Sequence, residues 1–453
     1  MIIMKFGGSS VKDAGRMRNV AEIIIKNIDK QPLVVLSALG GITDQLIDAL
    51  TYAARQRPKK AKKEIDRIEQ RHKKLISELF TESKYIDPLY QLIFQEIEKL
   101  RVLLGATETI RVESKRIANA VMSAGEILSS NILTQLLKSM GIASYCLDAR
   151  KMIYVEFHDQ DVVPLLGEIK KRAGKKIQKY LKDQQILVTQ GFIASTRDGA
   201  PATLGRDGSD YTASLLGAAL ACEEIQIWSD VDGILTADPT IVPEARPLKT
   251  MTFDEACELA YFGARVLQPA TIQPALESGI LVRVLNSNHP DEKGTVIISG
   301  SDTDKDVVVK SIAYKENITL LTIESSRLLL SPKIMEEIFM ILYRRGKRVY
   351  AVSKSATKVS ITIETNSDQK SLVKELAKQG QVHVDQNKVI VSVVGEKMRK
   401  SHELNYKILQ ILDEESIHID LISQFANQIS LTFIVDEKDI ERAVKLLHDK
   451  LIS

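Results

Sequence analysis

Residues 2–10 read IIMKFGGSS, a short run of strand-forming residues that leads directly into two glycines and two serines. A helical pattern follows over 19–27, a second strand pattern over 33–36, and a second helical pattern from Thr43. Alternation of short strands with helices is typical of a parallel sheet covered by helices. The opening of the chain therefore predicts an α/β domain.

The same alternation continues to about residue 300. Residues 56–116 interrupt it with a long segment rich in Lys, Glu, Arg and Gln, in which Ile and Leu recur at helical spacing. We predict a helical hairpin there, inserted on an α/β core that spans 1–300. The further strands of this domain are predicted over 144–147, 186–193, 225–228, 281–285 and 295–298.

The C-terminal part of the chain contains a repeat. Residues 301–306 (SDTDKD) form a polar linker, and 307–386 has the order β-α-β-β-α-β of a ferredoxin-like unit. The order restarts in 387–453, but no sixth strand remains there, so this second unit either borrows a strand or shares strands with the first across one sheet. The strands are predicted over 320–323, 348–352, 358–363, 381–384, 389–394, 417–422 and 429–435, and the helices over 332–343, 369–378, 401–412 and 437–451.

Composition and charge exclude several classes of protein. The 453 residues are 44% apolar, and 62 basic side chains nearly balance 59 acidic ones, with no dense basic tract for nucleic acid or anionic lipid. No run reaches the roughly 18 apolar residues of a membrane span. The three cysteines, Cys146, Cys222 and Cys257, match no zinc or disulfide spacing. We therefore expect a cytoplasmic protein that binds neither nucleic acid nor membrane.

The residues after the first strand are candidates for binding phosphate. Gly7 and Gly8 would leave backbone N–H groups bare, beside the hydroxyl of Ser9 and the ammonium of Lys5. A tight turn without a ligand is the alternative explanation for these glycines. A second strand end, in residues 34–43 (VVLSALGGIT), is also rich in small residues. Because ligands of open α/β sheets bind beyond the carboxyl ends of strands, the two ends predict one shared crevice.

Three further segments place charged residues at expected helix or strand ends. Residues 203–211 (TLGRDGSDY) put Arg206 and two glycines at a helix N-terminus suited to a carboxylate or phosphate, while Asp210 is either a helix cap or a catalytic group. Residues 228–239 (WSDVDGILTADP) end a strand with three acids, which fit a solvated turn, a metal site or a nucleotide site. Residues 123–126 (SAGE) put a carboxylate in the first turn of an apolar helix, where it either stabilises the helix dipole or binds a substrate ammonium group.

Together these segments resemble the aspartokinases of the amino acid kinase superfamily, and the resemblance runs through nearly the whole chain. It implies a three-layer αβα kinase domain with a mainly parallel sheet, followed by two ferredoxin-like ACT units of the α+β class. The segments that carry it, in the family's order, are KFGGSSV (5–11), VVLSALGGIT (34–43), SAGE (123–126), TQGFIAS (189–195), TLGRDGSDYTA (203–213), WSDVDGI (228–234) and FGARVLQPAT (262–271).

The resemblance also assigns roles by position. Lys5 corresponds to the lysine that neutralises the transferring phosphoryl group, and Asp210 to the aspartate that positions this lysine. Glu126 corresponds to the partner of the substrate α-ammonium group, and Arg206 to the clamp on its α-carboxylate. The other substrate neighbours are Ser37, Thr43 and Ser209, and the nucleotide or phosphate contacts are Lys5, Gly7, Gly8, Ser9, Gly208, Ser229, Asp230, Leu235, Thr240 and Arg265.

Several positions depart from the residues that are usual in the family. Asp207 stands where a glycine is usual and adds a negative charge near the expected phosphate site. The departures in the nucleotide segment are Leu235 for a tyrosine, Thr240 for an arginine, Arg265 for a lysine and Gln268 for a histidine.

Regulation by an amino acid effector is also implied by the resemblance. In lysine-sensitive relatives the first ACT unit usually has an aspartate where this chain has Tyr350, so a cationic effector would lose an acidic partner. The family architecture implies a homodimer joined through ACT units, or a dimer of dimers. The expected effector-pocket residues are Leu328, Ser331, Ile334, Met335, Val349 and Tyr350.

The implied reaction is the phosphorylation of the β-carboxylate of L-aspartate by ATP with Mg²⁺, the first step towards lysine, threonine, methionine and diaminopimelate. No metal ligand is assigned in the chain. One alternative is an amino-acid sensor that keeps the ACT units beside an inactive kinase domain, but Lys5, Arg206 and Asp210 are all present. Another is a sibling kinase acting on glutamate, carbamate or UMP, against which the SAGE motif and the paired ACT units argue.

Overall fold

The computed structural model describes residues 1–158, 161–181, 185–263, 268–300, 308–326, 332–365, 368–401, 403–424 and 429–452. The chain divides into two compact units. The first unit comprises Met1–Ile234, Lys249–Met251 and Gln268–Gly300, and the second comprises Leu235–Leu248, Thr252–Leu267 and Ser301–Ser453.

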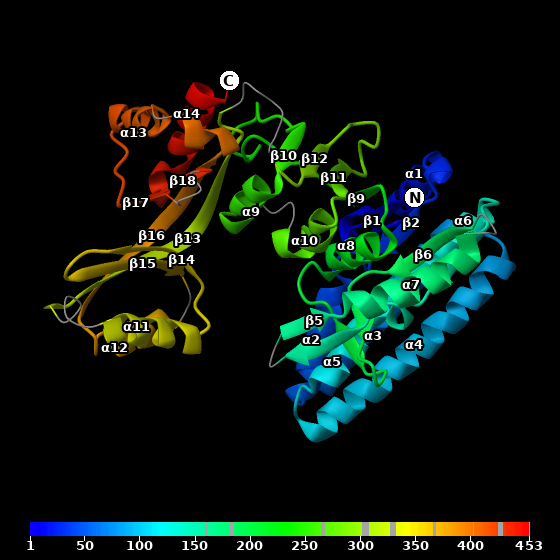
Figure 1. Ribbon diagram of the computed structural model, residues 1–453. Coiled ribbons are helices and arrows are strands. Elements are labelled where there is room, and N and C mark those ends of the chain that lie inside the picture. The colour runs from blue at the N-terminus through cyan, green and yellow to red at the C-terminus, as the bar shows by residue number, and fades with distance from the viewer. Residues whose placement is uncertain are drawn as a thin grey trace. The chain divides into compact units, whose positions relative to one another are not determined.

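The first unit is built on an eight-stranded sheet with the order β10-β12-β11-β9-β1-β2-β6-β3 (Figure 1). Its central strands pair in parallel, while β12 pairs antiparallel with β11. The mainly parallel sheet predicted from the sequence is thereby confirmed. The strands are β1 (Ile2–Phe6), β2 (Leu33–Leu36), β3 (Ser144–Leu147), β6 (Ile186–Gln190), β9 (Glu224–Ser229), β10 (Thr250–Thr252), β11 (Leu281–Asn286) and β12 (Thr295–Ile298).

The central strand β1 is buried on both faces and shows how the layers form. Successive side chains of a strand point to opposite faces. Met4 and Phe6 join the hydrophobic core built with helices α1 and α6, whereas Lys5 points to the face that α8 covers. The helices of this unit are α1 (Ala14–Lys26), α2 (Ile42–Ala54), α5 (Lys115–Met122), α6 (Ala124–Ser139), α7 (Leu166–Leu181), α8 (Gly208–Leu220) and α10 (Pro269–Glu277).

The predicted helical insertion consists of α3 (Pro58–Leu79) and α4 (Ser83–Ile110). The buried faces of α3 and α4 extend the same hydrophobic core through residues such as Ile65, Ile68, Ile93 and Ile97. The hairpin thus packs on helices α1, α2 and α6 through an apolar stripe at helical spacing. Two short hairpins, β4 (Val155–His158) with β5 (Asp161–Pro164) and β7 (Ile193–Ser195) with β8 (Pro201–Thr203), complete the unit.

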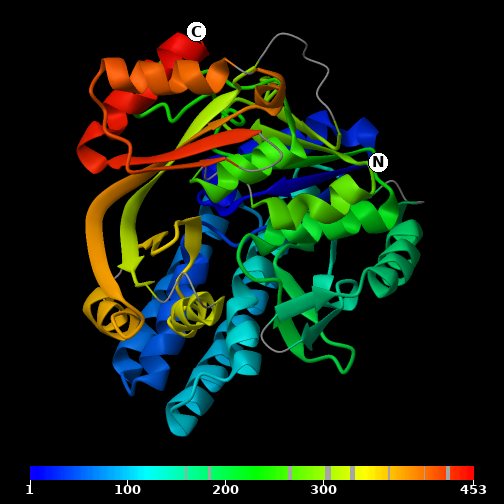
Figure 2. The same cartoon turned by 60° about the vertical axis from the view of Figure 1, so that its left-hand side comes forward.

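The second unit contains one six-stranded antiparallel sheet with the order β14-β15-β13-β16-β18-β17. Two of its strands are 14 residues long, and Figure 2 shows them curving between one pair of helices and the other. The strands are β13 (Ser311–Glu324), β14 (Val349–Lys354), β15 (Lys358–Glu364), β16 (Gln381–Val394), β17 (Leu421–Gln424) and β18 (Ser430–Asp436), and the helices are α11 (Pro332–Arg344), α12 (Gln369–Leu376), α13 (Leu404–Glu414) and α14 (Ile440–Leu451).

The long strands explain why the second repeat seemed to lack a strand. Ser311–Lys315, which the sequence analysis left unassigned, is the first part of β13 and pairs with 390–394. The strands predicted over 381–384 and 389–394 are one continuous strand, β16, with a positive φ at Asn387 in its middle. The expectation that the order restarts with a new strand at 389 was therefore wrong. Each half of the sheet has its own core, one under α11 and α12 and the other under α13 and α14.

Part of the chain that lies between two segments of the first unit packs with the second unit. Helix α9 (Phe253–Tyr261) carries Glu255, which is fully buried and accepts hydrogen bonds from the Lys310 ammonium (2.8 Å) and the Glu396 backbone N–H (2.7 Å). Both partners lie beside the long strands, at the start of β13 and just after β16. This helix is thereby tied to the sheet by a buried ion pair.

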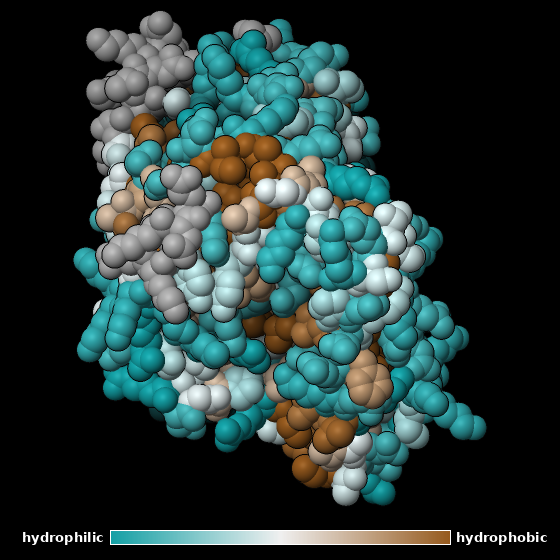
Figure 3. Space-filling view, turned by 90° about the vertical axis from the view of Figure 1, so that its right-hand side faces the viewer, coloured by the Kyte–Doolittle hydropathy of each residue, from teal (hydrophilic) through white to brown (hydrophobic). Residues whose placement is uncertain are grey.

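The face drawn in Figure 3 is mainly hydrophilic, with hydrophobic residues gathered in separate patches. This is the usual pattern for the surface of a folded domain. None of the helices in the described part of the chain is long and apolar enough to cross a membrane.

Two helical glycines differ in the space around them and predict opposite effects on stability. A Cβ at Gly217 in α8 would lie 2.5 Å from Ile225 Cδ1 in the sheet, whereas a Cβ at Gly105 in α4 would meet nothing within 4 Å. We expect Gly217→Ala to lower the free energy of unfolding by about 1–3 kcal/mol through overpacking. Gly105→Ala should raise it by up to about 1 kcal/mol. Urea unfolding of both variants would measure this, and equal effects would contradict the packing of α8 on β9.

Candidate active site

The loops that follow the central strands meet at one edge of the first unit's sheet. In register, Phe6 lies beside both Leu36 and Trp228, Leu36 beside Gln190, and Asn286 beside Ser229. All of these strands are parallel, so their carboxyl ends face the same side. The two glycine-rich strand ends from which the sequence predicts a crevice therefore meet at an edge to which five strands contribute.

Close backbone contact joins the first two glycine-rich loops. The Gly40 N–H donates to the Gly8 carbonyl at 3.0 Å, and a Cβ at Gly8 would lie 2.9 Å from the Ala38 carbonyl oxygen. Gly7 N–H in turn donates to the Trp228 carbonyl at the end of β9. Glycine is required at residue 8 because no side chain fits between the loops.

Lys5 and Asp210 form a buried ion pair beside this junction. The Lys5 ammonium lies 2.5 Å from Asp210 Oδ1, and the two side chains are 11% and 8% exposed. A Cβ built on Gly7 would be 3.6 Å from the same ammonium nitrogen. The cation is therefore held between the first turn of α8 and the glycine loop, where an anionic group bound by the loop would meet it.

Glu126 lies in the first turn of α6, directly behind the second loop. Its side chain is buried, Oε1 accepts a hydrogen bond from Ala38 N–H at 3.3 Å, and Oε2 has no partner within the described ranges. Burial raises the pKa of this carboxyl to about 8, although the backbone N–H groups of Glu126 and Ala38 act in the opposite direction. The unpartnered oxygen could accept a hydrogen bond from a ligand cation.

The helix carrying Glu126 approaches the second loop closely. A Cβ at Gly125 would lie 2.7 Å from Ala38 Cβ, and the Ser129 hydroxyl donates to the Ser37 carbonyl at 2.8 Å. Ser37 and Thr43, both predicted substrate neighbours, are half-buried; Ser37 lies in this loop and Thr43 in the first turn of α2, which follows it. The structure therefore brings the loop that carries Ser37 against the helix that carries Glu126.

The loop before α8 places Gly208, Ser209 and Asp210 at the start of that helix and leaves Arg206 largely exposed. Asp207 has a positive φ of 52°, a conformation that glycine adopts freely and that aspartate tolerates. This is the physical reason for glycine being the usual residue at this position. Burial, and secondly the charge of Asp210, raise the pKa of the Asp207 carboxyl.

The predicted nucleotide contacts are divided between the two units. Ser229 is the last residue of β9 and Asp230 follows it, at the strand edge of the first unit, whereas Leu235 and Thr240 belong to the second unit. Thr240 donates to Asp238 within its own turn. Arg265 lies outside the described residues, and Gln268 is the residue before α10.

A polar loop after β11 also reaches the strand edge and was missed in the sequence analysis. The Ser287 hydroxyl lies 2.8 Å from that of Ser10 and donates to the Ser229 carbonyl. The Arg16 guanidinium group donates hydrogen bonds to the Ser9 carbonyl and to the side-chain oxygen of Asn288. The signal that could have identified this loop is the polar sequence NSN (286–288), which directly follows the strand predicted over 281–285. The other loops of the site were predicted in the same way, from the residues that follow a strand.

The predicted effector residues occupy varied places in the second unit. Leu328 and Ser331 lie outside the described residues. Ile334 is buried in the core under α11, and Met335 packs against that core. Val349 begins β14, and Tyr350 is buried, with its hydroxyl donating to Glu364 at 2.5 Å. A carboxylate thus stands beside Tyr350, on the neighbouring strand β15.

Comparison with known proteins identifies both parts of the chain. The model of the amino acid kinase family matches residues 1–286, and a model of the ACT domain matches residues 391–451. The chain is 34% identical over 459 residues to aspartokinase 1 of Arabidopsis thaliana chloroplasts, covering 98% of this chain and 79% of the relative. It is 31% identical over 461 residues to the lysine-sensitive aspartokinase 3 of Escherichia coli, covering 100% and 99%.

Solved structures agree with these relatives. The crystal structure of E. coli aspartokinase III in complex with lysine and aspartate (T-state) superposes with a TM-score of 0.87 at 30% identity, over the full length of both chains. The structure of the same enzyme with aspartate and ADP (R-state) gives a TM-score of 0.83, also at 30% identity and full coverage.

The positive φ of Asp207 predicts an order of stability for three residues at this position. Asp207→Gly should raise the free energy of unfolding by up to about 1 kcal/mol, because glycine adopts this φ without strain and the repulsion from Asp210 is lost. Asp207→Ala also removes the charge, but it keeps the strain and should be the least stable of the three. Denaturant unfolding measures the order, and an alanine variant as stable as the glycine variant would contradict it.

Proposed function

The chain belongs to the aspartokinases of the amino acid kinase family, and we propose that it transfers the γ-phosphoryl group of ATP to the β-carboxylate of L-aspartate, giving 4-phospho-L-aspartate and ADP. The observation that carries this proposal is the Lys5 ammonium, held by Asp210 beside the junction of the glycine loops. The product is the activated acid from which the lysine, threonine, methionine and diaminopimelate pathways begin.

The reaction needs charge compensation more than proton transfer. A carboxylate must attack a phosphoryl group while both are negatively charged, and the transition state spreads charge over the phosphoryl oxygens. The carboxylate is already ionised at neutral pH, so no general base is required. Lys5 would offset the charge that develops, and Asp210 would keep it in place in a site of low exposure, where a fixed cation is most effective.

We assign the substrate and nucleotide contacts from the resemblance to the aspartokinases. Glu126 would accept the α-ammonium group, and Arg206, exposed in this structure, would close on the α-carboxylate. Ser37, Thr43 and Ser209 are the remaining substrate neighbours. The phosphates and nucleotide would be bound by Gly7, Gly8, Ser9, Gly208, Ser229, Asp230, Leu235, Thr240 and Arg265.

Magnesium enters this proposal as the ion that accompanies ATP. The described residues contain no group of three or more His, Cys, Asp or Glu side chains that could hold a metal ion. Mg²⁺ commonly takes most of its ligands from substrate phosphates and water, with only one or two carboxylates. We propose that the ion is delivered with the nucleotide, where it would neutralise phosphate charge.

For regulation, we propose that an amino acid binds the second unit and that the chain forms a homodimer through it, or a dimer of dimers. The ACT match and the E. coli relative solved with lysine support an amino acid effector. Phe339, Met340 and Tyr343 leave an apolar face of α11 exposed, which supports pairing between copies. A cytoplasmic location is supported by the three free cysteines.

Aspartyl hydroxamate formation from ATP, Mg²⁺ and L-aspartate tests the proposed reaction, with L-glutamate as the comparison substrate. Lys5→Ala should reduce turnover by at least about a thousandfold, because an unscreened phosphoryl charge raises the barrier by several kcal/mol. Lys26→Ala, which removes an exposed lysine of the same unit, should leave turnover unchanged. Circular dichroism checks that Lys5→Ala folds despite the unpaired Asp210.

Aspartate-specific product would support the kinase. Folded wild-type protein that forms no product with either substrate would favour the amino-acid sensor instead. Normal turnover in Lys5→Ala would remove this residue from the mechanism.

The buried carboxyl of Glu126 predicts a pH dependence of substrate capture. Its pKa is raised to about 8, so below this pH the group is mainly neutral and pairs poorly with an ammonium group, and above it the group is ionised. We expect kcat/KM for aspartate to rise as the pH increases through about 8, since this ratio reports ionisation in the free enzyme. Glu126→Gln should have a lower kcat/KM that is flat between pH 6.5 and 8.5. The same rise in the variant would contradict the assignment.

A further inference from the structure

We propose that Gln190 is a positioning residue for the substrate site, one that fixes helix α6 and thereby places the Glu126 carboxylate against the substrate's α-ammonium group. The inference rests on the proposed function, because it takes Glu126 as the ammonium partner. Gln190 is the last residue of β6 and is only 3% exposed.

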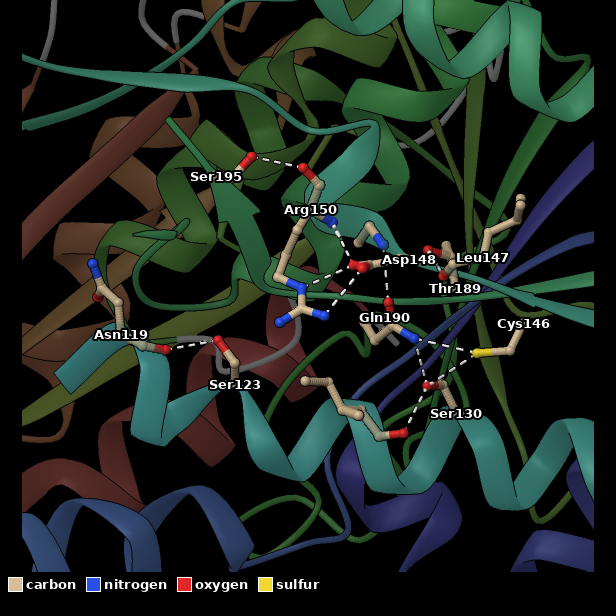
Figure 4. A network of polar contacts seen from close by, with 12 residues as sticks. Asn119, Ser123, Ser130, Cys146, Leu147, Asp148, Arg150, Thr189, Gln190 and Ser195 are labelled. Carbon is tan, nitrogen blue, oxygen red and sulfur yellow. Dashed lines mark hydrogen bonds and ion pairs between the residues drawn. The ribbon is translucent and has the colours of Figure 1, made fainter. Parts of the chain in front are cut away.

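The side chain of Gln190 joins three other elements (Figure 4). Its Nε2 donates to the Ser130 hydroxyl of α6 at 2.8 Å and lies 3.3 Å from the Cys146 sulfur of β3, while Oε1 accepts the Ala149 backbone N–H at 2.9 Å. Both ends of this buried amide are therefore satisfied, and each by a different element. Such a bridge fixes distances that apolar packing alone leaves adjustable.

Ser130 lies four residues after Glu126, one turn further along the same helix. Residues at this spacing share a helix face, so a displacement of Ser130 displaces the Glu126 carboxylate with it. Among the described residues, other polar links of this helix are the 3.3 Å bond from Ala38 N–H to Glu126 and the bond from Ser129 to the Ser37 carbonyl. Two more join it to β3, from Ser144 to the Thr134 carbonyl and between Cys146 and Ser130. The first two end on the loop after β2 and the last two on β3, so Gln190 supplies the link from α6 to β6, the strand between them.

The residue after Gln190 connects the same point to the phosphate side of the site. Gly191 N–H donates to the Leu36 carbonyl at 2.8 Å, and a Cβ at Gly191 would lie 2.5 Å from Ser209 Cβ, beside Asp210. Residues 190 and 191 therefore lie between α6, which carries Glu126, and α8, which carries Asp210. A small shift of one helix against the other would misplace the aspartate relative to the phosphoryl group.

The chain supplies a matched control in Gln226. It is a buried glutamine on β9 of the same sheet, 4% exposed, and among the described residues its amide bonds to Trp228 and Glu224, both of its own strand. Loss of this amide costs buried hydrogen bonds without touching α6. It therefore separates positioning of Glu126 from a general loosening of the sheet.

The experiment compares Gln190→Met, Ser130→Ala, the double variant and Gln226→Met as full-length proteins in the hydroxamate assay. For Gln190→Met and Ser130→Ala we expect KM for aspartate to rise about tenfold, with kcat and KM for ATP changed less than about twofold, because misplacement affects the ammonium contact first. In the double variant, KM for aspartate should be no higher than in the more affected single variant, because both changes break the same hydrogen bond between Gln190 and Ser130. Gln226→Met should leave KM for aspartate unchanged.

An unchanged KM for aspartate in both single variants, additive effects in the double variant, or an equal rise in Gln226→Met would each overturn the inference. Should Gln190→Met fail to fold, as judged by thermal unfolding, Ser130→Ala decides, because it leaves the amide and Ala149 in place. Glu126→Gln in the same assay tests the premise. An unchanged KM for aspartate in Glu126→Gln would reject Glu126 as the ammonium partner. A raised KM in Glu126→Gln together with an unchanged KM in Gln190→Met and Ser130→Ala would reject only the positioning role of Gln190.

Discussion

The contact between the Lys5 ammonium and the Asp210 carboxylate is the interaction around which the first unit is arranged. Removing two charges from water is expensive, and a buried pair often contributes no net stability compared with apolar residues. Apolar side chains at these two positions would complete the core between β1 and α8. The pair is better explained by the charge that it presents to the strand edge, and the sheet and helix supply the low exposure that makes one fixed cation effective.

Close backbone approach is the second constraint on this site. Gly8 and Gly40 let two loops touch, Gly125 lets α6 approach the second loop, and Gly191 lets α8 start against the end of β6. Each glycine stands where a Cβ would collide with a neighbouring loop or helix. The loops and helices around the site therefore approach one another closely, and its polar side chains are held by contacts from several strands.

The second unit uses a different device, two strands long enough to belong to both halves of one sheet. A strand of 14 residues cannot bend sharply without losing its ladder, so the two halves are mechanically joined through β13 and β16. The irregular pairing near Asn317 and Asn387, both with positive φ, lies where one half gives way to the other. The buried pair of Glu255 and Lys310 fastens α9 to the same sheet. In the sequence, α9 lies between two segments of the first unit, but it packs as part of the second unit.

The sequence by itself determined the elements whose cause is local. The alternation of apolar runs with helical patterns predicted the parallel sheet and the inserted hairpin, and glycines after strands predicted which ends would meet. The motifs gave Lys5, Glu126 and Asp210 as chemical candidates, because charged residues at strand and helix ends are visible in a linear sequence. Tertiary structure alone decided the rest: that the pair of Lys5 and Asp210, which the family resemblance implied, is buried, that Ser311–Lys315 completes the second repeat, and that Gln190 reaches Ser130. Such contacts depend on strand register and on packing between segments that are far apart in the chain. The sequence around a residue carries no periodic pattern that shows which residues lie next to it across a sheet.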